Sequence, residues 1–96
     1  MLLEHFIKYI VDTRGISQSS AKHYVQALKT INNLLGSYDI GICNLFALTS
    51  VSELDQVNSF LETNNEFQEK DATGHRMYSV AFKHYRRFLC WYNQIG

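Results

Sequence analysis

Residues 17–36 carry the clearest pattern in the sequence, and it is the pattern of a long amphipathic helix. Ser17 is a natural N-cap residue, and Gly36 ends the segment with a residue that suits a helix C-terminus. Between them the apolar side chains recur at helical spacing and form one stripe, made of Ala21, Tyr24, Leu28, Ile31 and Leu35. The sequence therefore predicts a helix over this segment, with the stripe buried in a core.

Two further segments carry helix signals. Residues 2–13 place apolar side chains on one face and charged side chains on the other, and a glycine then stops the run. Ser50 is followed three residues later by Glu53, which is the spacing of a capping box at the start of another helix. We expect that helix to end at Asn64 and Asn65.

The last helix is expected to begin after Thr73 or Gly74 and to run almost to the end of the chain. Its buried stripe consists of Tyr78, Ala81, Phe82, Tyr85, Leu89 and Tyr92. Residues 37–49 fit no amphipathic period and are predicted to form a loop with one short turn at most. The polar stretch 64–73 is predicted to be a mobile connection between helices.

The composition agrees with an all-helical chain. It contains no proline and no valine-rich alternating stretch, and 46% of its 96 residues are hydrophobic. We therefore predict an all-α fold, a four-helix bundle, in one domain that spans residues 1–96.

The sequence indicates a cytoplasmic protein. No apolar run approaches the roughly 18 residues that a membrane span needs, and the N-terminus lacks the layout of a signal peptide. Cys43 and Cys90 lie far apart and belong to no CxxC pair, which favours reduced thiols over a disulfide.

Catalytic chemistry finds no support in the residues. The four histidines are scattered without a pair at i, i+4, so no metal site is expected, and the single glycines build no phosphate-binding loop. Neither cysteine stands in a nucleophile signature. We expect no catalytic residue, no metal and no cofactor in this chain.

The charges are strongly segregated along the chain although the net charge is zero. Residues 73–96 hold four basic residues and no acidic one, whereas residues 50–72 hold six acidic residues against Lys70. A concentrated positive face is the electrostatic footprint of a phosphate-binding surface, although a solvated helix face looks the same.

Two helix faces are basic and free of carboxylates. The last helix gathers Arg76, Lys83 and Arg87 opposite its buried stripe. The helix over residues 17–36 presents Ser19, Lys22, Gln26, Lys29 and Asn33. Such side chains suit phosphates and base edges, and the helix N-terminus at Ser17 adds unpaired N–H groups.

Several core positions and one turn together resemble a known family. These are Phe6, Tyr9 and Ile10, then Gly15, Ile16 and Ser17, then Ser20, Tyr24 and Leu28, and finally residues 78–82 and 85–89. Over nearly the whole chain the arrangement is similar to the SAM-like core-binding domain of phage integrases and other tyrosine recombinases. Residues 74–79 look more like the N-terminal helical domains of restriction-type endonucleases.

The resemblance implies a helical module that packs against one side of duplex DNA. A separate C-terminal catalytic domain, outside this chain, would carry the strand cleavage, so no tyrosine here inherits a nucleophile role. The family's DNA contacts map by position onto Ser17, Ser19, Ser20, Lys22, His23, Gln26 and Lys29, and from the last helix onto Arg76, Lys83 and Arg87.

These observations predict a non-catalytic DNA-binding module, the N-terminal fragment of a larger integrase-like or restriction-type protein. The acidic helix, including Glu62, is expected on the side away from DNA. The alternative is a protein-interaction or dimerisation module, in which Phe88, Cys90 and Trp91 form an exposed patch and the basic face is only solvated. A steep loss of affinity with salt would distinguish DNA binding from an apolar interface.

Overall fold

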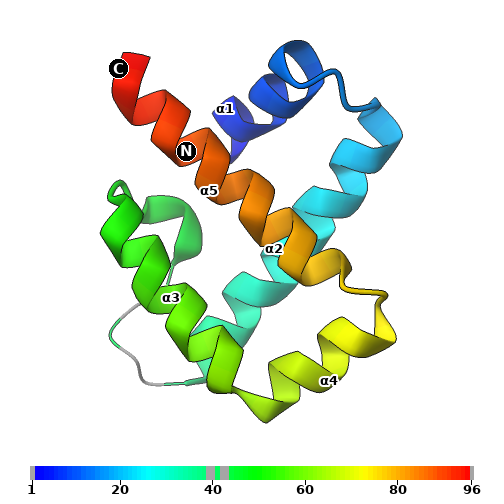
Figure 1. Cartoon of the computed structure of the whole chain (residues 1–96), viewed down its shortest axis with the longest axis vertical. Helices are drawn as coiled ribbons and strands as arrows, with labels where there is room; N and C mark the ends of the chain where they lie inside the picture. Colours follow the sequence, from blue (N-terminus) through cyan, green and yellow to red (C-terminus); the bar gives the residue numbers. More distant parts are fainter. Residues whose placement is uncertain (1, 39–40, 42–43, 96) are drawn as a thin grey trace.

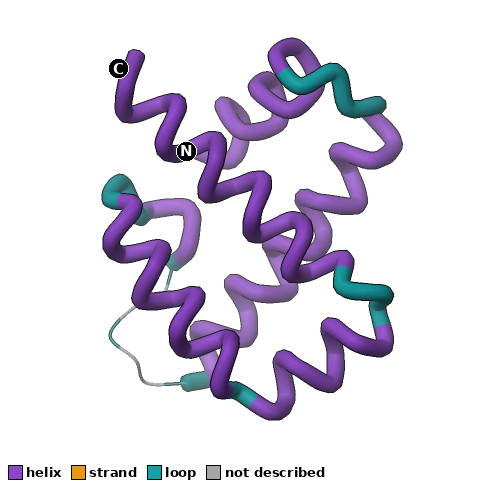
Figure 2. Tube along the Cα trace, viewed as in Figure 1, coloured by secondary structure: helices purple, strands orange, loops and turns teal. Residues whose placement is uncertain are grey.

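The computed structural model describes residues 2–38, 41 and 44–95 of this chain. Its elements in chain order are α1 (Leu2–Lys8), a π-helical turn η1 (Tyr9–Thr13), α2 (Gln18–Ser37), a 3-10 turn η2 (Leu45–Ala47), α3 (Val51–Thr63), α4 (Asn65–Thr73) and α5 (Met77–Ile95) (Figure 1). Every regular element in this part of the chain is helical, and it contains no strand (Figure 2). The predicted all-α class is confirmed, but the number of α-helices is five and not four.

The predicted helix caps are confirmed in position. The Ser17 hydroxyl accepts the Ser20 N–H at 3.2 Å, and α2 continues one residue past Gly36. Ser50 caps α3, but its hydroxyl accepts the N–H of Ser52 at 3.2 Å. The expected capping box between Ser50 and Glu53 is therefore wrong. The two serine hydroxyls lie 2.7 Å apart, and this hydrogen bond holds the Ser50 oxygen over Ser52.

The segment predicted as a mobile connection is a helix, α4. Asn64 ends α3 and also caps α4, because its side-chain oxygen accepts the Phe67 N–H at 2.9 Å. The sequence of this segment shows no apolar helical period, because its two buried positions are Phe67 and an acidic residue, Asp71. A polar residue in the buried stripe removes the apolar repeat on which the sequence prediction depends.

Asp71 joins α4 to the start of α5. Its side chain is 2% exposed, and its carboxylate accepts the Ser79 N–H at 3.0 Å and also the Ser79 hydroxyl. Ser79 stands in the first turn of α5, where the N–H groups have no partner within the helix. Arg76, just before α5, has a φ of 63° and so cannot cap the helix from an extended backbone. Asp71 therefore supplies the N-terminal cap from the neighbouring helix.

The core is centred on the ring of Tyr85, which is fully buried. Its centroid lies 5.2 Å from that of Phe6, 5.9 Å from that of Phe46 and 5.6 Å from that of Phe88. These rings come from α1, η2 and α5, so the aromatic cluster packs the first and last helices against η2 in the middle of the chain. Burial raises the pKa of the Tyr85 phenol well above its ordinary value.

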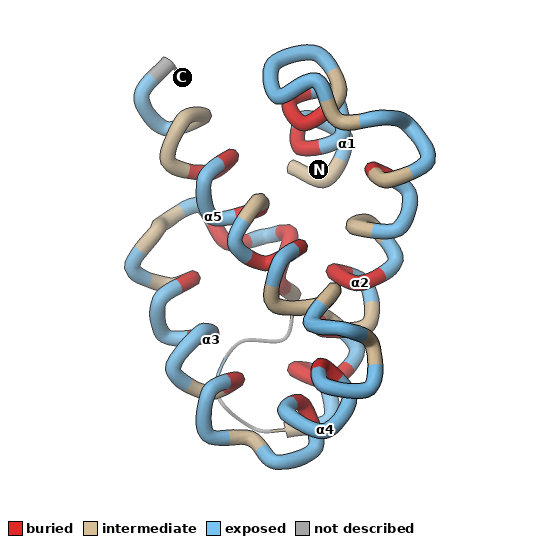
Figure 3. The backbone as a smooth tube through the Cα atoms, turned by 45° about the vertical axis from the view of Figure 1, so that its right-hand side comes forward, coloured by how far each residue is buried: buried red, intermediate tan, exposed pale blue. Residues whose placement is uncertain are grey.

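Two long helices, α2 and α5, cross and pack on each other, with α5 in front of α2 in Figure 1. Both helices carry buried and exposed residues along their length (Figure 3), and the buried ones belong to one hydrophobic core. The molecule measures 34 × 27 × 17 Å, so it is flattened and has two broad faces. The exposed side of α5 and the exposed side of α2 belong to opposite faces.

Removing the Asp71 carboxylate should destabilise the protein. We expect Asp71→Ala to lower the free energy of unfolding by about 2–3 kcal/mol, because it removes a charged cap and leaves the Ser79 donors without their acceptor. The neighbouring exposed carboxylate provides a control, and Glu69→Ala should change stability by less than about 0.5 kcal/mol. Urea unfolding measures both. A loss below about 0.5 kcal/mol for Asp71→Ala would show that α5 does not need this cap.

Truncating Tyr85 tests the centre of the core. We expect Tyr85→Ala to cost about 3–5 kcal/mol, as for other large aromatic truncations. The buried hydroxyl finds no hydrogen-bond partner among the described protein atoms. Tyr85→Phe should therefore be near neutral or slightly stabilising, because it removes an unpaired polar group and leaves the ring in place. Equal losses for the two variants, measured by urea unfolding, would contradict this.

Candidate nucleic-acid interface

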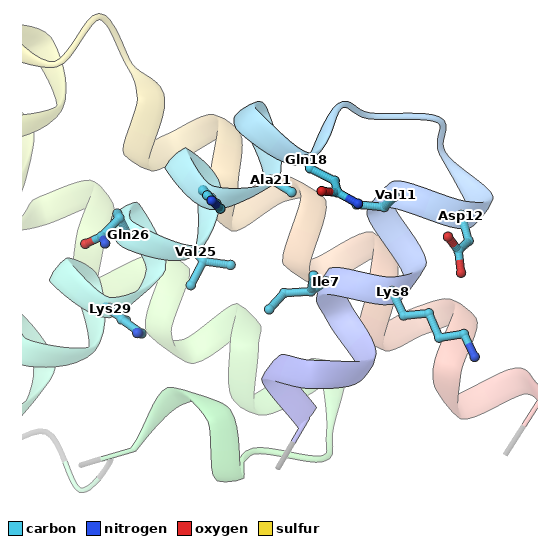
Figure 4. A pocket seen from close by; sticks show the side chains of 10 residues that line it. Ile7, Lys8, Val11, Asp12, Gln18, Ala21, Val25, Gln26 and Lys29 are labelled. Atoms are coloured by element: carbon cyan, nitrogen blue, oxygen red, sulfur yellow. The ribbon is translucent and has the colours of Figure 1, made fainter.

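The ten predicted DNA contacts are accessible but do not share one face. Nine of them are exposed, and Ser20 is half-buried. Because α2 and α5 pack through their buried sides, the lysines of α2 and the basic residues of α5 point away from each other. The ribbon of α5 runs behind α2 in Figure 4, where Lys29 is seen, and in front of α2 in Figure 1. A flat partner contacts one set or the other.

Four positively charged or chargeable side chains converge on the α5 side. Lys83, His84 and Arg87 line a shallow hollow with Val80. Arg14 lies in the turn after η1. Its charge and that of Arg87 both lower the pKa of His84. We call this set, Arg14, Lys83, His84 and Arg87, the basic surface.

The turn that carries Arg14 is held in place by the backbone. The Arg14 N–H donates to the carbonyl of Tyr9 at 3.2 Å, and the Ile16 N–H donates to that of Ile10 at 2.9 Å. Gly15 stands between them with a φ of 69°, a left-handed conformation that glycine adopts without strain. This turn brings a residue of the N-terminal segment to the face of α5.

His84 lies in the middle of the basic surface. Its ring is half-buried and packs on the ring of Tyr24, with the centroids 4.9 Å apart. Burial lowers the pKa of His84, and the charges of Arg87 and Arg14 lower it further. Its buried Nδ1 has no partner among the described protein atoms. The neutral form is therefore favoured until an anion offsets the neighbouring charges.

The start of α2 flanks the basic surface. Ser20 lies one helical turn before Tyr24 on the same side of α2, and Tyr24 contacts His84. The Ser17 hydroxyl donates to that of Ser20 at 3.1 Å, which orders both side chains at the helix N-terminus. The first N–H groups of a helix attract anions, so the N-terminus of α2 adds to the positive potential of the basic surface beside it.

The other predicted contacts of α2 lie elsewhere. Lys22, Gln26 and Lys29 line a groove between α1 and α2 on the opposite face of the molecule. Gln26 also borders a separate hollow, where His23 lies beside Met77 and other residues at the start of α5. Ser19, with Lys22, is on the exposed side of α2.

The acidic helix is closer to α5 than expected. Arg86 donates to the carboxylate of Asp55 with an Nε to Oδ1 distance of 2.8 Å, and this hydrogen bond lowers the pKa of Asp55. Glu62 lines a hollow with Arg76 and Lys83. The expectation that Glu62 lies on the far side of the molecule is therefore wrong. The cause is the packing of α3 along α5, which places Arg76 beside a carboxylate.

The predicted apolar patch near the C-terminus is largely packed. Phe88 is fully buried, and the ring of Trp91 is half-buried against that of Tyr9 with centroids 4.8 Å apart. The alternative reading required Phe88 to be exposed, and this is wrong because that residue joins the core cluster of Tyr85. Cys90 is a half-buried thiol, and Cys43 lies outside the described residues.

The sequence prediction missed Arg14 and His84. Arg14 stands in a turn, where helical spacing gives no information about its neighbours. His84 follows Lys83 and precedes Arg87 by three residues, a spacing that places it on the flank of the basic face. That spacing is the one signal that could have identified it. Among the described residues no cluster of three potential metal ligands occurs.

The low pKa of His84 makes the folded state sensitive to acid. The unfolded chain binds a proton on His84 at a higher pH than the folded chain, so its neutral form stabilises the fold above about pH 6.5, and this contribution is lost as the pH falls through the folded pKa. We expect His84→Gln to lose less thermal stability than the parent between about pH 7.5 and pH 5. Differential scanning calorimetry measures it, with His23→Gln as the exposed control. An unchanged pH profile in His84→Gln would contradict the assignment.

Comparison with known proteins identifies no relative of this chain. No family model, no curated protein and no solved structure matches the chain. In the described part of the chain no helix has both the length and the apolar character that a membrane span requires.

Proposed function

We propose that this chain is a non-catalytic DNA-binding module that holds a separate recombinase or nuclease domain on duplex DNA. The fold type that goes with this proposal is the SAM-like core-binding domain of tyrosine recombinases or its counterpart in restriction-type endonucleases. The all-α architecture, with two long crossing helices, is compatible with it. The partner is duplex DNA, and the catalytic residues lie in the other domain.

The observation that carries the proposal is the pair of cations, Lys83 and Arg87, that line one hollow with His84, while Arg14 lies near enough for its charge to act on that ring. These three cations come from segments some 70 residues apart in sequence, and among the described residues none of them forms an ion pair. Unpaired cations held near one another repel, and a phosphate chain relieves that repulsion while releasing its own counterions. Arginine also binds phosphate oxygens in a bidentate manner, which suits a backbone contact.

The contact surface is narrower than the sequence predicts. The basic surface and the adjacent start of α2, with Ser17 and Ser20, lie on one side of the molecule. Lys22, Gln26 and Lys29 lie on the other, so they are not part of the same docking face. Arg76 is the weakest contributor, because it shares a hollow with Glu62, which would repel a nearby phosphate, and it does not line the hollow of Lys83 and Arg87.

Salt dependence gives the direct test. We expect a fluorescently labelled duplex to bind in the micromolar range or more weakly, with log K falling against log salt at a slope of about −3 for three neutralised phosphates. The triple variant Arg14→Gln, Lys83→Gln and Arg87→Gln should lose most of the affinity and flatten the slope. All three residues are exposed, so each change should alter stability by less than about 0.5 kcal/mol.

The opposite face supplies a matched control. Lys8→Gln, Lys22→Gln and Lys29→Gln together remove the same number of positive charges from the groove between α1 and α2. This control should retain DNA binding with a nearly unchanged salt slope. If the two triple variants weaken binding equally, only net charge matters and the basic surface is not the site. Parental affinity in the first triple variant also rejects the proposal.

A further inference from the structure

The groove between α1 and α2 has an apolar floor that the rest of the chain leaves uncovered. Its volume is about 530 Å³, within the range of binding sites rather than of packing defects. Ile7 from α1 and Val25 from α2 point toward one another across it, and Val11 and Ala21 continue the floor (Figure 4). Ile7 is 37% exposed, and among the described residues the other large hydrophobic exposed to this degree is Val80.

Three lysines are among the residues that line this groove. Lys8 stands on α1, and Lys22 and Lys29 stand on α2, whereas Asp12 is the one carboxylate among the residues that line the groove. Within the described chain none of these lysines forms an ion pair. The rim therefore carries an excess of positive charge beside an apolar surface, which selects a partner that is apolar along one stripe and acidic at its edges.

The length of the groove indicates an elongated partner. Lys22 and Lys29 are seven residues apart on α2, which corresponds to about 10 Å or two helical turns. An amphipathic helix presents apolar side chains at i, i+4 and i+7, and the step from i to i+7 covers the same distance, with charges on both flanks. We propose that this groove binds an acidic amphipathic helix of a partner protein, with its apolar residues between Ile7 and Val25 and its carboxylates on Lys8, Lys22 and Lys29.

A second copy of this chain does not offer such a helix. Six of its nine acidic residues lie on α3 and α4, where the apolar side chains Leu54, Val57, Leu61 and Phe67 are already buried in the core. DNA does not fit the groove either, because a phosphate backbone has no apolar stripe to cover Ile7 and Val25. The inference is also independent of the proposed DNA contact, since the groove and the hollow of Lys83, His84 and Arg87 share no lining residue.

A designed peptide tests the groove with the full chain. The probe is a labelled amphipathic helix of about 14 residues, with leucines at i, i+4, i+7 and i+11 and glutamates at the flanking positions. We expect micromolar binding by fluorescence anisotropy, and backbone amide shifts in NMR spectra that are concentrated at Ile7, Val11 and Val25. A scrambled peptide of the same composition and a peptide with lysine for glutamate should bind at least about tenfold more weakly.

Two triple variants then separate this site from the DNA surface. Lys8→Gln, Lys22→Gln and Lys29→Gln should weaken the peptide by about tenfold, whereas Arg14→Gln, Lys83→Gln and Arg87→Gln should leave it within about twofold of the parent. Ile7→Gln should also weaken peptide binding. Because that change also risks misfolding, the two charge variants provide an independent test of the same site. Equal binding of the scrambled peptide, or NMR shifts mapped elsewhere, overturns the proposal. Self-association abolished by Ile7→Gln also overturns it, in favour of a second copy.

Discussion

The hydrogen bonds of the buried Asp71 carboxylate decide where α5 begins and how it lies. They tie the end of α4 to the first turn of α5. A carboxylate at a helix N-terminus satisfies unpaired N–H groups and complements the helix dipole. Burial of this polar side chain is tolerated here because the Ser79 N–H and hydroxyl both donate to it. The direction of α5, and with it the position of every basic residue on that helix, follows from this contact.

The aromatic cluster around Tyr85 then determines how closely α5 packs against the rest of the core. Phe6 and Phe46 pack on Tyr85 from the N-terminal segment and from η2, so α5 is held against α2 across the core. Two helices that share a core through their buried stripes must show their exposed stripes to opposite sides. That constraint divides the charged residues of the molecule into two separate surfaces.

The two surfaces differ in chemistry. The basic surface combines permanent cations with a histidine whose pKa is held low by burial and by Arg87 and Arg14. It suits a dense and flexible row of charges such as a phosphate backbone. The groove between α1 and α2 combines lysines with an exposed apolar floor around Ile7, and it suits a helical polypeptide. A module with both could hold DNA on one face and a protein on the other.

The sequence alone determined the all-α class and the starts of α2 and α3, because Ser17 and Ser50 cap their helices through local hydrogen bonds within three residues. It did not determine α4, since a helix with Asp71 in its buried stripe has no apolar period to read. Helical spacing correctly predicted nine of the ten candidate contact residues as exposed, but exposure on one helix says nothing about the direction of another. Only tertiary packing separated Lys22 from Lys83, placed Glu62 beside Arg76 and brought Arg14 to His84, because those relations depend on contacts between residues far apart in the chain.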